Sequence, residues 1–224
     1  MHTVRVWDLP TRLFHWLLAA SVIGLIVTGS LGGNWMNWHL RLGYAVLTLL
    51  LFRLVWGFVG GHWSRFGSFI YAPSSLVAYL QGRSRPEHQV GHSPLGALSV
   101  FALLLILAAQ VGSGLLSDDE ISFFGPLTRF VSGETVSAAT AYHKDIGKLL
   151  IFALVGLHVV AIAYYKWVRK QGLVKPMVLG DKHLPVAVPA ARDSAGSRAL
   201  ALIVLALSAL VVRWVVGLGG APSF

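Results

Sequence analysis

The chain has 224 residues, of which 55% are hydrophobic and only 12% are charged, and its mean hydropathy is +0.68. A soluble domain carries about a quarter charged residues, so this composition excludes an ordinary soluble domain and indicates an integral membrane protein. The chain contains no cysteine, which excludes cysteine-ligated iron–sulfur clusters, covalently attached c-type haem and disulfides. The formal net charge of +9 has to be interpreted from its placement along the chain.

Five apolar segments are long enough to cross a bilayer, which takes about 20 helical residues. The predicted spans are 13–31, 40–59, 95–116, 146–165 and 199–216. Because backbone polar groups in lipid must be satisfied within the segment, we expect each span to be a helix. The first span lacks a small-residue cleavage pattern, so we expect it to stay in the mature protein. The fifth contains Arg213 near its end, where the side chain can extend to the interface.

The basic residues are divided unequally between the two sides of the membrane. The side of the N-terminus carries twelve of them: Arg5, Arg12, Arg65, Arg83, Arg85, Lys166, Arg169, Lys170, Lys175, Lys182, Arg192 and Arg198. The opposite side carries five: Arg41, Arg129, Lys144, Lys148 and Arg213. Basic loops stay in the cytoplasm, so we predict a cytoplasmic N-terminus and a C-terminus on the outer side of the membrane. The net charge therefore reports topology and contact with membrane lipid, and it does not indicate a nucleic-acid partner.

Three connecting segments have signals of their own. Residues 117–141 form a predicted outer loop that is acidic, which suits either a solvated face or the steering of a basic partner. Its acidic residues are Asp118, Asp119, Glu120 and Glu134. Residues 72–85 predict a short interfacial helix that starts at a serine cap and ends near Gly82. Residues 175–197 have the composition of a flexible linker.

Nine histidines are the strongest functional signal, and four of them fall in or at the ends of predicted spans: His15, His39, His143 and His158. Ionisable residues in membrane spans usually face the interior and mark function. Any one of them is explained equally well as a ligand or as a hydrogen bond between helices. The remaining loop histidines are expected to have no special role, with His2, His88 and His183 as solvated side chains and His62 at the cytoplasmic rim.

The depths of these four histidines in the membrane help to distinguish a ligand role from hydrogen bonds between helices. His143 and His158 are 15 residues apart, which separates them by about 22 Å along a helix and leaves them within roughly 60° of the same face. His39 then lies level with His143, and His15 lies nearer the level of His158. Two pairs at two depths can each clamp one planar macrocycle, which predicts two bis-histidine haems. Zinc fits less well, because its sites need three or four converging ligands.

Arginine placement adds partners for the anionic propionates of haem. Arg53 lies 14 residues after His39, about 40° from it in helical angle and about 21 Å deeper, so it reaches the level of the other pair. A buried cation needs such an anion. Arg12 and Arg41 lie within a turn of His15 and His39, where a propionate contact and ordinary interfacial anchoring are equally good explanations.

Four stretches together resemble the bacterial cytochrome b561 family, which includes the membrane cytochrome b subunits of nickel–iron hydrogenases. They are VWDLPTRLFHW, WHLRLGYAVLTLLLFRLVWGFVG, GHSPLGALSVFALLLILAAQVGSGLLSDDE and YHKDIGKLLIFALVGLHVVAIAYY. The resemblance covers residues 4–170. It implies an all-α integral membrane protein whose four-helix transmembrane bundle holds two b haems, with the fifth C-terminal transmembrane helix outside this core. The expected parts are a di-haem core (1–170), a cytoplasmic linker (171–197) and an extra helix with its tail (198–224).

The resemblance also implies the ligands. His15 and His158 would hold the haem on the cytoplasmic side, and His39 and His143 the haem on the periplasmic side. His92, in the family-like stretch GHSPLG, either caps the following helix or binds a propionate or a quinone head group.

Bis-histidine ligation leaves no open iron position, which favours electron transfer over chemistry at the haem. The resemblance implies a bacterial inner membrane and supplies the quinone, so the first hypothesis is a carrier between the quinone pool and a periplasmic redox partner, either a c-type cytochrome or a hydrogenase. An alternative is a superoxide:quinone oxidoreductase on the same scaffold, which would need a cationic outer funnel. Its candidate residues are Arg41, Lys144 and Lys148. A third possibility is a haem-free structural protein whose histidines pair between helices.

Overall fold

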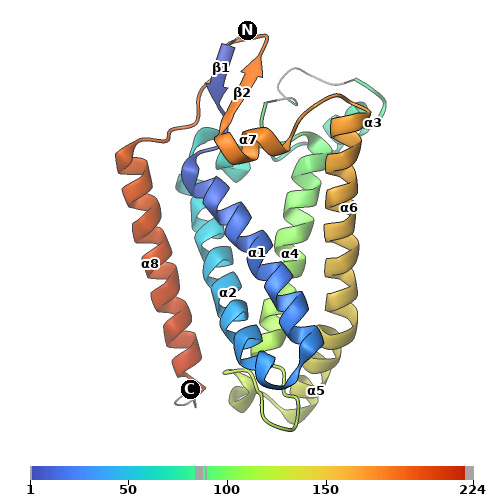
Figure 1. The fold of residues 1–224 in the computed structure, drawn as a ribbon, viewed down its shortest axis with the longest axis vertical. Helices are drawn as coiled ribbons and strands as arrows, with labels where there is room; N and C mark the ends of the chain where they lie inside the picture. The colour runs from blue at the N-terminus through green and yellow to red at the C-terminus, as the bar shows by residue number, and fades with distance from the viewer. Residues whose placement is uncertain (1, 84–87, 89, 220–224) are drawn as a thin grey trace. The chain divides into compact units, whose positions relative to one another are not determined.

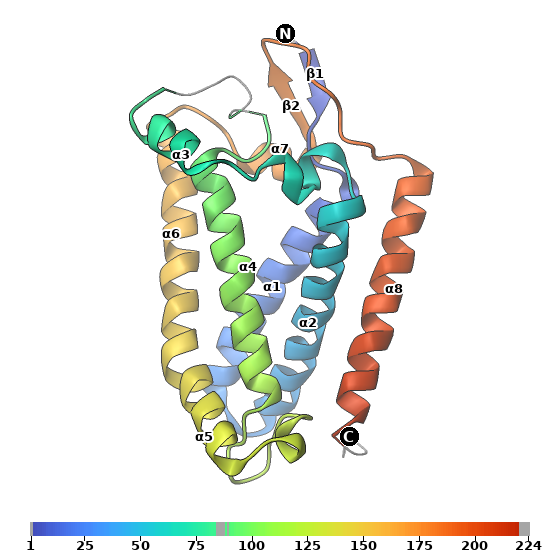
Figure 2. The ribbon, with the colours of Figure 1, turned by 180° about the vertical axis from the view of Figure 1, so that it is seen from behind.

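The computed structural model describes residues 2–83, 88 and 90–219. Within this part of the chain, five helices are long and apolar enough to cross a membrane (Figures 1 and 2). They are built around α1 Leu9–Leu31, α2 Met36–Val59, α4 Pro94–Leu115, α6 Lys148–Trp167 and α8 Ala195–Gly217. The prediction of five membrane-spanning helices is confirmed, and their ends lie within a few residues of the predicted ones.

The helical run that contains α6 begins earlier than predicted. Helix α5 Gly133–Ala141 and the π-helix η6 Tyr142–Gly147 lead directly into α6, which gives one run from Gly133 to Trp167. Ser132 caps this run, because its hydroxyl accepts a 3.3 Å hydrogen bond from the Thr135 amide. The prediction of loop structure throughout 117–141 is therefore wrong for its last nine residues.

Polar caps set the beginnings of two membrane helices. The Thr11 amide donates to Asp8 Oδ1 at 2.8 Å, which caps α1. The Gly96 amide donates to Ser93 Oγ at 3.2 Å ahead of α4, whose first residue is Pro94. The capping role that was one alternative for His92 is thus filled by its neighbour Ser93.

Helix α3 Pro73–Leu80 lies where the short interfacial helix was predicted, but it has no serine cap. Ala72 precedes it and offers no capping side chain, while Pro73 supplies a backbone torsion already suited to the first turn. The helix ends at Leu80, close to the predicted end near Gly82, and the last two residues of the segment 72–85, including Arg85, lie outside the described residues.

Residues 175–197 contain ordered structure, so the prediction of a flexible linker is wrong for much of this segment. Helix α7 Val174–Leu179 ends at Gly180, which has φ 94° and accepts hydrogen bonds from the Val6 and Trp7 amides at 2.9 and 3.0 Å. A positive φ at this position favours glycine. Strand β2 Asp181–Leu184 then pairs antiparallel with β1 His2–Arg5, and the two strands lie side by side in Figures 1 and 2.

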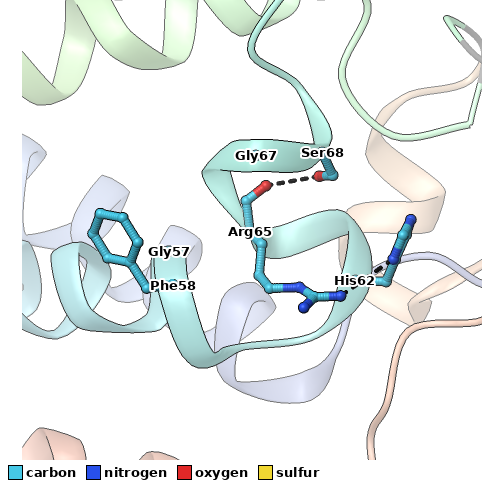
Figure 3. A pocket seen from close by; sticks show the side chains of 6 residues that line it. All are labelled: Gly57, Phe58, His62, Arg65, Gly67 and Ser68. Atoms are coloured by element: carbon cyan, nitrogen blue, oxygen red, sulfur yellow. Dashed lines mark hydrogen bonds between the residues drawn. The ribbon is translucent and has the colours of Figure 1, made fainter.

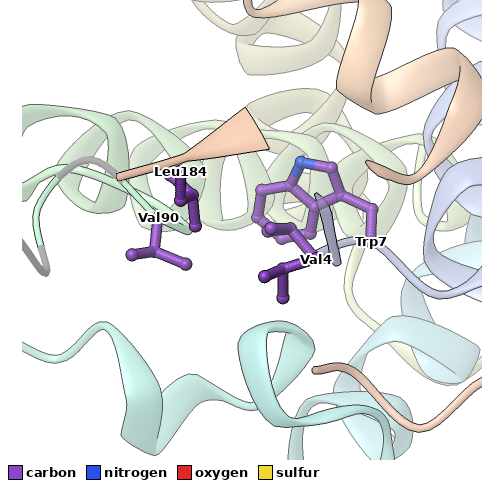
Figure 4. Close-up of a cluster of buried hydrophobic side chains, with 5 residues drawn as sticks. Val4, Trp7, Val90 and Leu184 are labelled. Atoms are coloured by element: carbon purple, nitrogen blue, oxygen red, sulfur yellow. The ribbon is translucent and has the colours of Figure 1, made fainter. Parts of the chain in front are cut away.

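A small hydrophobic cluster stabilises this two-stranded sheet. Its buried members are Val4, Val6, Trp7, Val90 and Leu184, and four of them are labelled in Figure 4. They come from three separate parts of the sequence, so burial of apolar surface holds the two-stranded sheet against the segment ahead of α4.

The chain divides into two compact units, each built from three segments. The first comprises residues 1–15, 53–102 and 155–204, and the second comprises 16–52, 103–154 and 205–224. The five long helices each contribute residues to both units. His15 and His158 fall in the first unit, and His39 and His143 fall in the second, so each predicted pair belongs to one unit.

Candidate functional site

The first histidine pair joins α1 to α6. The ring centroids of His15 and His158 are 6.4 Å apart, with an angle of 48° between the ring planes, and both side chains are half-buried. The depth argument from the sequence placed these two residues together, and the structure does bring them together.

The second pair joins α2 to the π-helix η6. The ring centroids of His39 and His143 are 6.1 Å apart, and their planes meet at 82°. A metal between two opposed imidazoles, with metal–nitrogen bonds of about 2 Å, holds the ring centroids roughly 6 Å apart. Both pairs therefore have the spacing that one bis-histidine metal centre requires.

Hydrogen bonds fix which ring nitrogen of the second pair can act as a ligand. His39 Nδ1 lies 3.1 Å from the Leu25 carbonyl oxygen, and His143 Nδ1 lies 2.9 Å from the Gln110 carbonyl oxygen. A carbonyl oxygen only accepts, so Nδ1 carries the proton in both rings. Nε2 then keeps its lone pair, and this is the arrangement commonly seen for metal-binding histidines.

Two glycines make these carbonyl contacts possible. Gly29 and Gly114 each lie four residues after the carbonyl that a histidine binds, and the residue at that position donates its own amide to the same carbonyl. A Cβ at Gly29 would come within 3.0 Å of His39 Cε1, and one at Gly114 within 2.9 Å of His143 Cε1. Any side chain there would therefore push the imidazole away from the carbonyl.

Gln110 holds His143 at two points. Its carbonyl oxygen accepts from the ring, and its side-chain Nε2 donates to the His143 carbonyl oxygen at 2.9 Å. A π-helix shifts the backbone hydrogen-bond register by one residue, and such turns occur frequently at functional sites. Gly147 closes this turn against the Gln110 amide, where a Cβ would collide with Oε1.

A cavity of about 710 Å³ surrounds the second pair and is lined by residues of the second unit. His39 and His143 lie on its wall among apolar side chains such as Leu107, Val111 and Phe152. This volume lies in the range of small-molecule and cofactor sites, which are about 300–1,000 Å³ and mostly apolar. A large, flat and mainly apolar group fits this site.

The first unit contains buried polar atoms that lack partners. Arg53 is 3% exposed and its guanidinium lies 4.6 Å above the Phe66 ring, while its Nη1 has no hydrogen-bond partner among the described residues. His92 Nδ1 is likewise buried without a partner in the described part of the chain. A buried cation is costly unless an anion meets it, so these atoms fit an anionic group such as a carboxylate.

The ring of His92 lies between two aromatic rings, 4.7 Å from Trp7 and 4.4 Å from Phe69. Burial, together with the positive charge of Arg53, the neighbouring His15 and Lys182, lowers the pKa of His92 to about 3. The ring is therefore neutral at physiological pH, and one of its nitrogens can donate a hydrogen bond without adding charge.

The other two predicted arginines have different surroundings. Arg12 Nη1 donates to the Val178 carbonyl oxygen at 2.6 Å, and its Nη2 lies 3.9 Å from Asp193. Arg41 is exposed, with its guanidinium 5.2 Å above the Trp38 ring, and it does not line the cavity of about 710 Å³. These placements suit anchoring for both side chains.

The loop histidines differ in solvent exposure. His2 and His183 are exposed, and His183 Nδ1 lies 2.9 Å from Thr3 Oγ1. His88 is 6% exposed and its ring lies 5.2 Å from that of Tyr71, so the prediction of a solvated His88 is wrong. His62 is half-buried and contacts Arg65.

Asp8 is a buried residue whose role sequence reasoning missed. Its carboxylate is fully buried and accepts from the Thr11 amide at 2.8 Å, the Gly61 amide at 2.9 Å and Ser64 Oγ at 3.0 Å. Trp56 Nε1 donates to it at 3.4 Å. An acidic residue directly before an apolar helix is a capping signal that could have revealed the role of Asp8.

Comparison with known proteins gives one consistent family. The family model described as prokaryotic cytochrome b561 matches residues 6–180. A probable Ni/Fe-hydrogenase B-type cytochrome subunit of Azotobacter chroococcum mcd 1 is 27% identical over 217 residues, covering 79% of this chain and 87% of that relative.

Two further relatives are similar at the same level. The probable Ni/Fe-hydrogenase B-type cytochrome subunit of Bradyrhizobium diazoefficiens is 25% identical over 218 residues, which is 80% of this chain and 86% of the relative. The probable Ni/Fe-hydrogenase 1 B-type cytochrome subunit of Escherichia coli K12 is 26% identical over 190 residues, which is 69% of this chain and 80% of the relative. No solved structure matches the chain.

Proposed function

We propose, because the chain belongs to the prokaryotic cytochrome b561 family, that it binds two b haems and transfers electrons across a bilayer. In this proposal His15 and His158 ligate one haem, and His39 and His143 ligate the other. The observation that carries it is the spacing of the two pairs, 6.4 and 6.1 Å between ring centroids, which suits one iron in each pair.

The protein's own residues define what such a site can do. When bound, each haem supplies an iron that accepts and releases one electron. Two imidazole ligands per iron would leave no ligand position for oxygen, so the site is suited to electron transfer. In the second unit, the carbonyls of Leu25 and Gln110 accept from the ligand rings, which orients the rings and makes Nε2 more basic.

Arg53 is our candidate for the propionate partner in the first unit, and the buried Nδ1 of His92 supports the same assignment. A guanidinium binds a carboxylate with charge-assisted hydrogen bonds, which would satisfy Nη1. We assign Arg12 and Arg41 to anchoring, because Arg12 already contacts the Val178 carbonyl and Arg41 lies over Trp38.

The partners follow from charge and from the relatives. We propose an inner-membrane protein with its N-terminus in the cytoplasm, supported by twelve basic residues on that side against five on the other. The relatives named as hydrogenase cytochrome subunits support a hydrogenase as the redox partner, with a c-type cytochrome as the alternative and quinone as the membrane substrate. Residues 1–170 would form the di-haem core, 171–197 the cytoplasmic connection and 198–224 the extra helix and tail.

The test is a histidine-to-alanine series with haem stoichiometry as the readout. We expect two haems per chain in the wild type, loss of the same haem in His15→Ala and His158→Ala, and loss of the other in His39→Ala and His143→Ala. His183→Ala, an exposed histidine outside the spans, is the matched control and should keep both. A wild-type spectrum without a reduced α-band would refute the proposal, and full haem retention in one variant would refute that ligand.

A further inference from the structure

A second cavity, of about 350 Å³, lies in the first unit just beyond the end of α2. It is lined by Gly57, Phe58, His62, Arg65, Gly67 and Ser68. Figure 3 shows Phe58 on one side and the side chains of Arg65 and His62 on the other. The polar wall consists of His62 from the short 3-10 helix η2 His62–Ser64, Ser68 from η3 Phe66–Ser68, and Arg65 between the two helices.

The polar wall of this cavity is rich in hydrogen-bond donors. Arg65 Nη2 lies 3.3 Å from His62 Nδ1. A guanidinium can only donate, so His62 Nδ1 accepts and the proton of its neutral ring is on Nε2. In the part of the chain that the structure describes, the remaining guanidinium N–H groups and this imidazole N–H have no hydrogen-bond partner, so they can bind an acceptor.

Among the described residues, the Arg65 guanidinium has no carboxylate partner. The residues that line the cavity include no Asp or Glu, and Arg65 forms no ion pair with a carboxylate in the described part of the chain. The backbone oxygen of Arg65 accepts from Ser68 Oγ at 2.7 Å, which holds the loop without using the guanidinium. The cavity is therefore suited to an anion with several acceptor oxygens.

The apolar side of the cavity lies at the end of a predicted membrane span. Leu54, Val55 and Phe58 are 55%, 43% and 68% exposed in the last turns of the predicted span, where their side chains can meet lipid. Arg65 lies six residues past Val59, the last residue of α2. An exposed apolar turn that leads into a basic pocket positions the pocket near the head groups of the bilayer.

We propose that this cavity binds the phosphate of an anionic phospholipid, with Arg65 and His62 as donors and Phe58 against the glycerol and acyl region. A zwitterionic lipid would bring an ammonium group, and the lining residues offer no carboxylate to meet it. Inorganic phosphate shares the same acceptor chemistry, so the test must separate a lipid site from a free-anion site.

The experiment measures lipid binding to the purified full-length protein by native mass spectrometry, with phosphatidylglycerol, phosphatidylcholine and inorganic phosphate as separate probes. We expect phosphatidylglycerol to bind more tightly than the other two. Arg65→Gln should weaken its binding about tenfold, the loss expected for one charge-assisted contact, and Arg65→Lys should weaken it less because the charge remains. His62→Gln tests the second donor and should also weaken binding.

Arg192→Gln is the matched control, because Arg192 is an exposed cation outside the cavity and the substitution removes the same charge. Unfolding temperatures measured without added lipid establish that the variants are folded, and His62→Gln with Arg65→Lys carry the test if Arg65→Gln is unstable. Equal binding by Arg65→Gln and Arg192→Gln, or equal binding of the two lipids, would overturn the proposal. Tight binding of inorganic phosphate alone would assign the cavity to a free anion instead.

Discussion

A single methyl group at Gly114 should disturb one ligand of the second histidine pair. In Gly114→Ala, the new Cβ would lie 2.9 Å from His143 Cε1, which is closer than real Cβ atoms approach other atoms. The imidazole must move by roughly half an ångström to reach ordinary contact, and the carbonyl of Gln110 is on the same helix face. The substitution therefore weakens the 2.9 Å hydrogen bond that sets the proton on Nδ1.

The size of the effect follows from two costs. Loss of a hydrogen bond of this kind costs about 0.5–1.5 kcal/mol. A ring held away from its preferred rotamer costs about 0.5–1.5 kcal/mol more. The sum corresponds to a loss of roughly 5- to 150-fold in the affinity of the group held by His143, in line with the 10- to 100-fold known for contacts that orient metal ligands.

The matched control is Gly112→Ala, two residues away on the same helix, where a Cβ meets nothing within 4 Å. Both substitutions raise helix propensity by about 0.5–1 kcal/mol, so they differ mainly in the contact with His143. Haem content and redox titration of purified protein should show one altered haem in Gly114→Ala and two normal haems in Gly112→Ala. Identical spectra and potentials for the two variants would refute the role assigned to Gly114.

Three further predictions concern the supporting network. Gln110→Met keeps the carbonyl contact to His143 but removes the side-chain bond, and should lower the unfolding free energy by about 1 kcal/mol, measured by denaturation in detergent. Asp8→Ala leaves buried donors without their acceptor and should cost about 3 kcal/mol by the same assay; a loss under 1 kcal/mol would contradict the network. The hydrogen bond from Arg5 lowers the pKa of Asp181, so its contribution is present above the unfolded pKa of about 3.9 and is lost as pH falls through the folded pKa. The protection factors of the β1 amides, which correct for the intrinsic pH dependence of exchange, should therefore fall below about pH 4 in the wild type, and Asp181→Asn should remove this pH dependence.

The long helices were predictable from the sequence because lipid leaves a spanning segment almost no other structure. The pairing of His143 with His39, and of His158 with His15, followed from the fixed rise of a helix, and the structure brings both pairs together. Their ligation of haem stays a prediction.

The missed features depend on contacts between distant segments. The two-stranded sheet of β1 and β2 joins residues 176 positions apart, as in the contact of Arg5 with Asp181. No local pattern in 175–197 indicates this pairing. The π-helix at His143 is held by a hydrogen bond from Gln110 of another helix. This contact leaves no signal in the local sequence, so the sequence predicted an ordinary helix there. His88 looked solvated because its neighbours in sequence are polar, while its actual contacts include Tyr71.

The surroundings of the two pairs predict different reduction potentials. The first unit holds the buried cation Arg53 and the buried carboxylate of Asp8, and Arg53 would stabilise the reduced form of an iron held by His15 and His158. In the second unit, carbonyl contacts make both ligand rings more electron-donating, which stabilises the oxidised form.

The charged side chains around the cavity of about 710 Å³, which contains His39 and His143, act in the same direction. They are three carboxylates (Asp118, Asp119 and Asp145) and two ammonium groups (Lys144 and Lys148). Burial opposes ionisation of Asp119, but hydrogen bonds from the backbone amides of Phe123, Ser122 and Ile121 lower its pKa, so the carboxylate is charged at neutral pH. The net negative balance adds to the stabilisation of the oxidised form.

We therefore expect the haem of His39 and His143 to have the lower potential, so that electrons move downhill from it to the haem of His15 and His158. Arg53→Met should lower the potential of the haem of His15 and His158 by on the order of tens of millivolts and leave that of the haem of His39 and His143 unchanged. Redox titration of the wild type, the variant and the two single-haem proteins measures both values. A higher potential at the His39 and His143 haem would mean that Arg53 and the carbonyl contacts do not determine the direction of electron transfer.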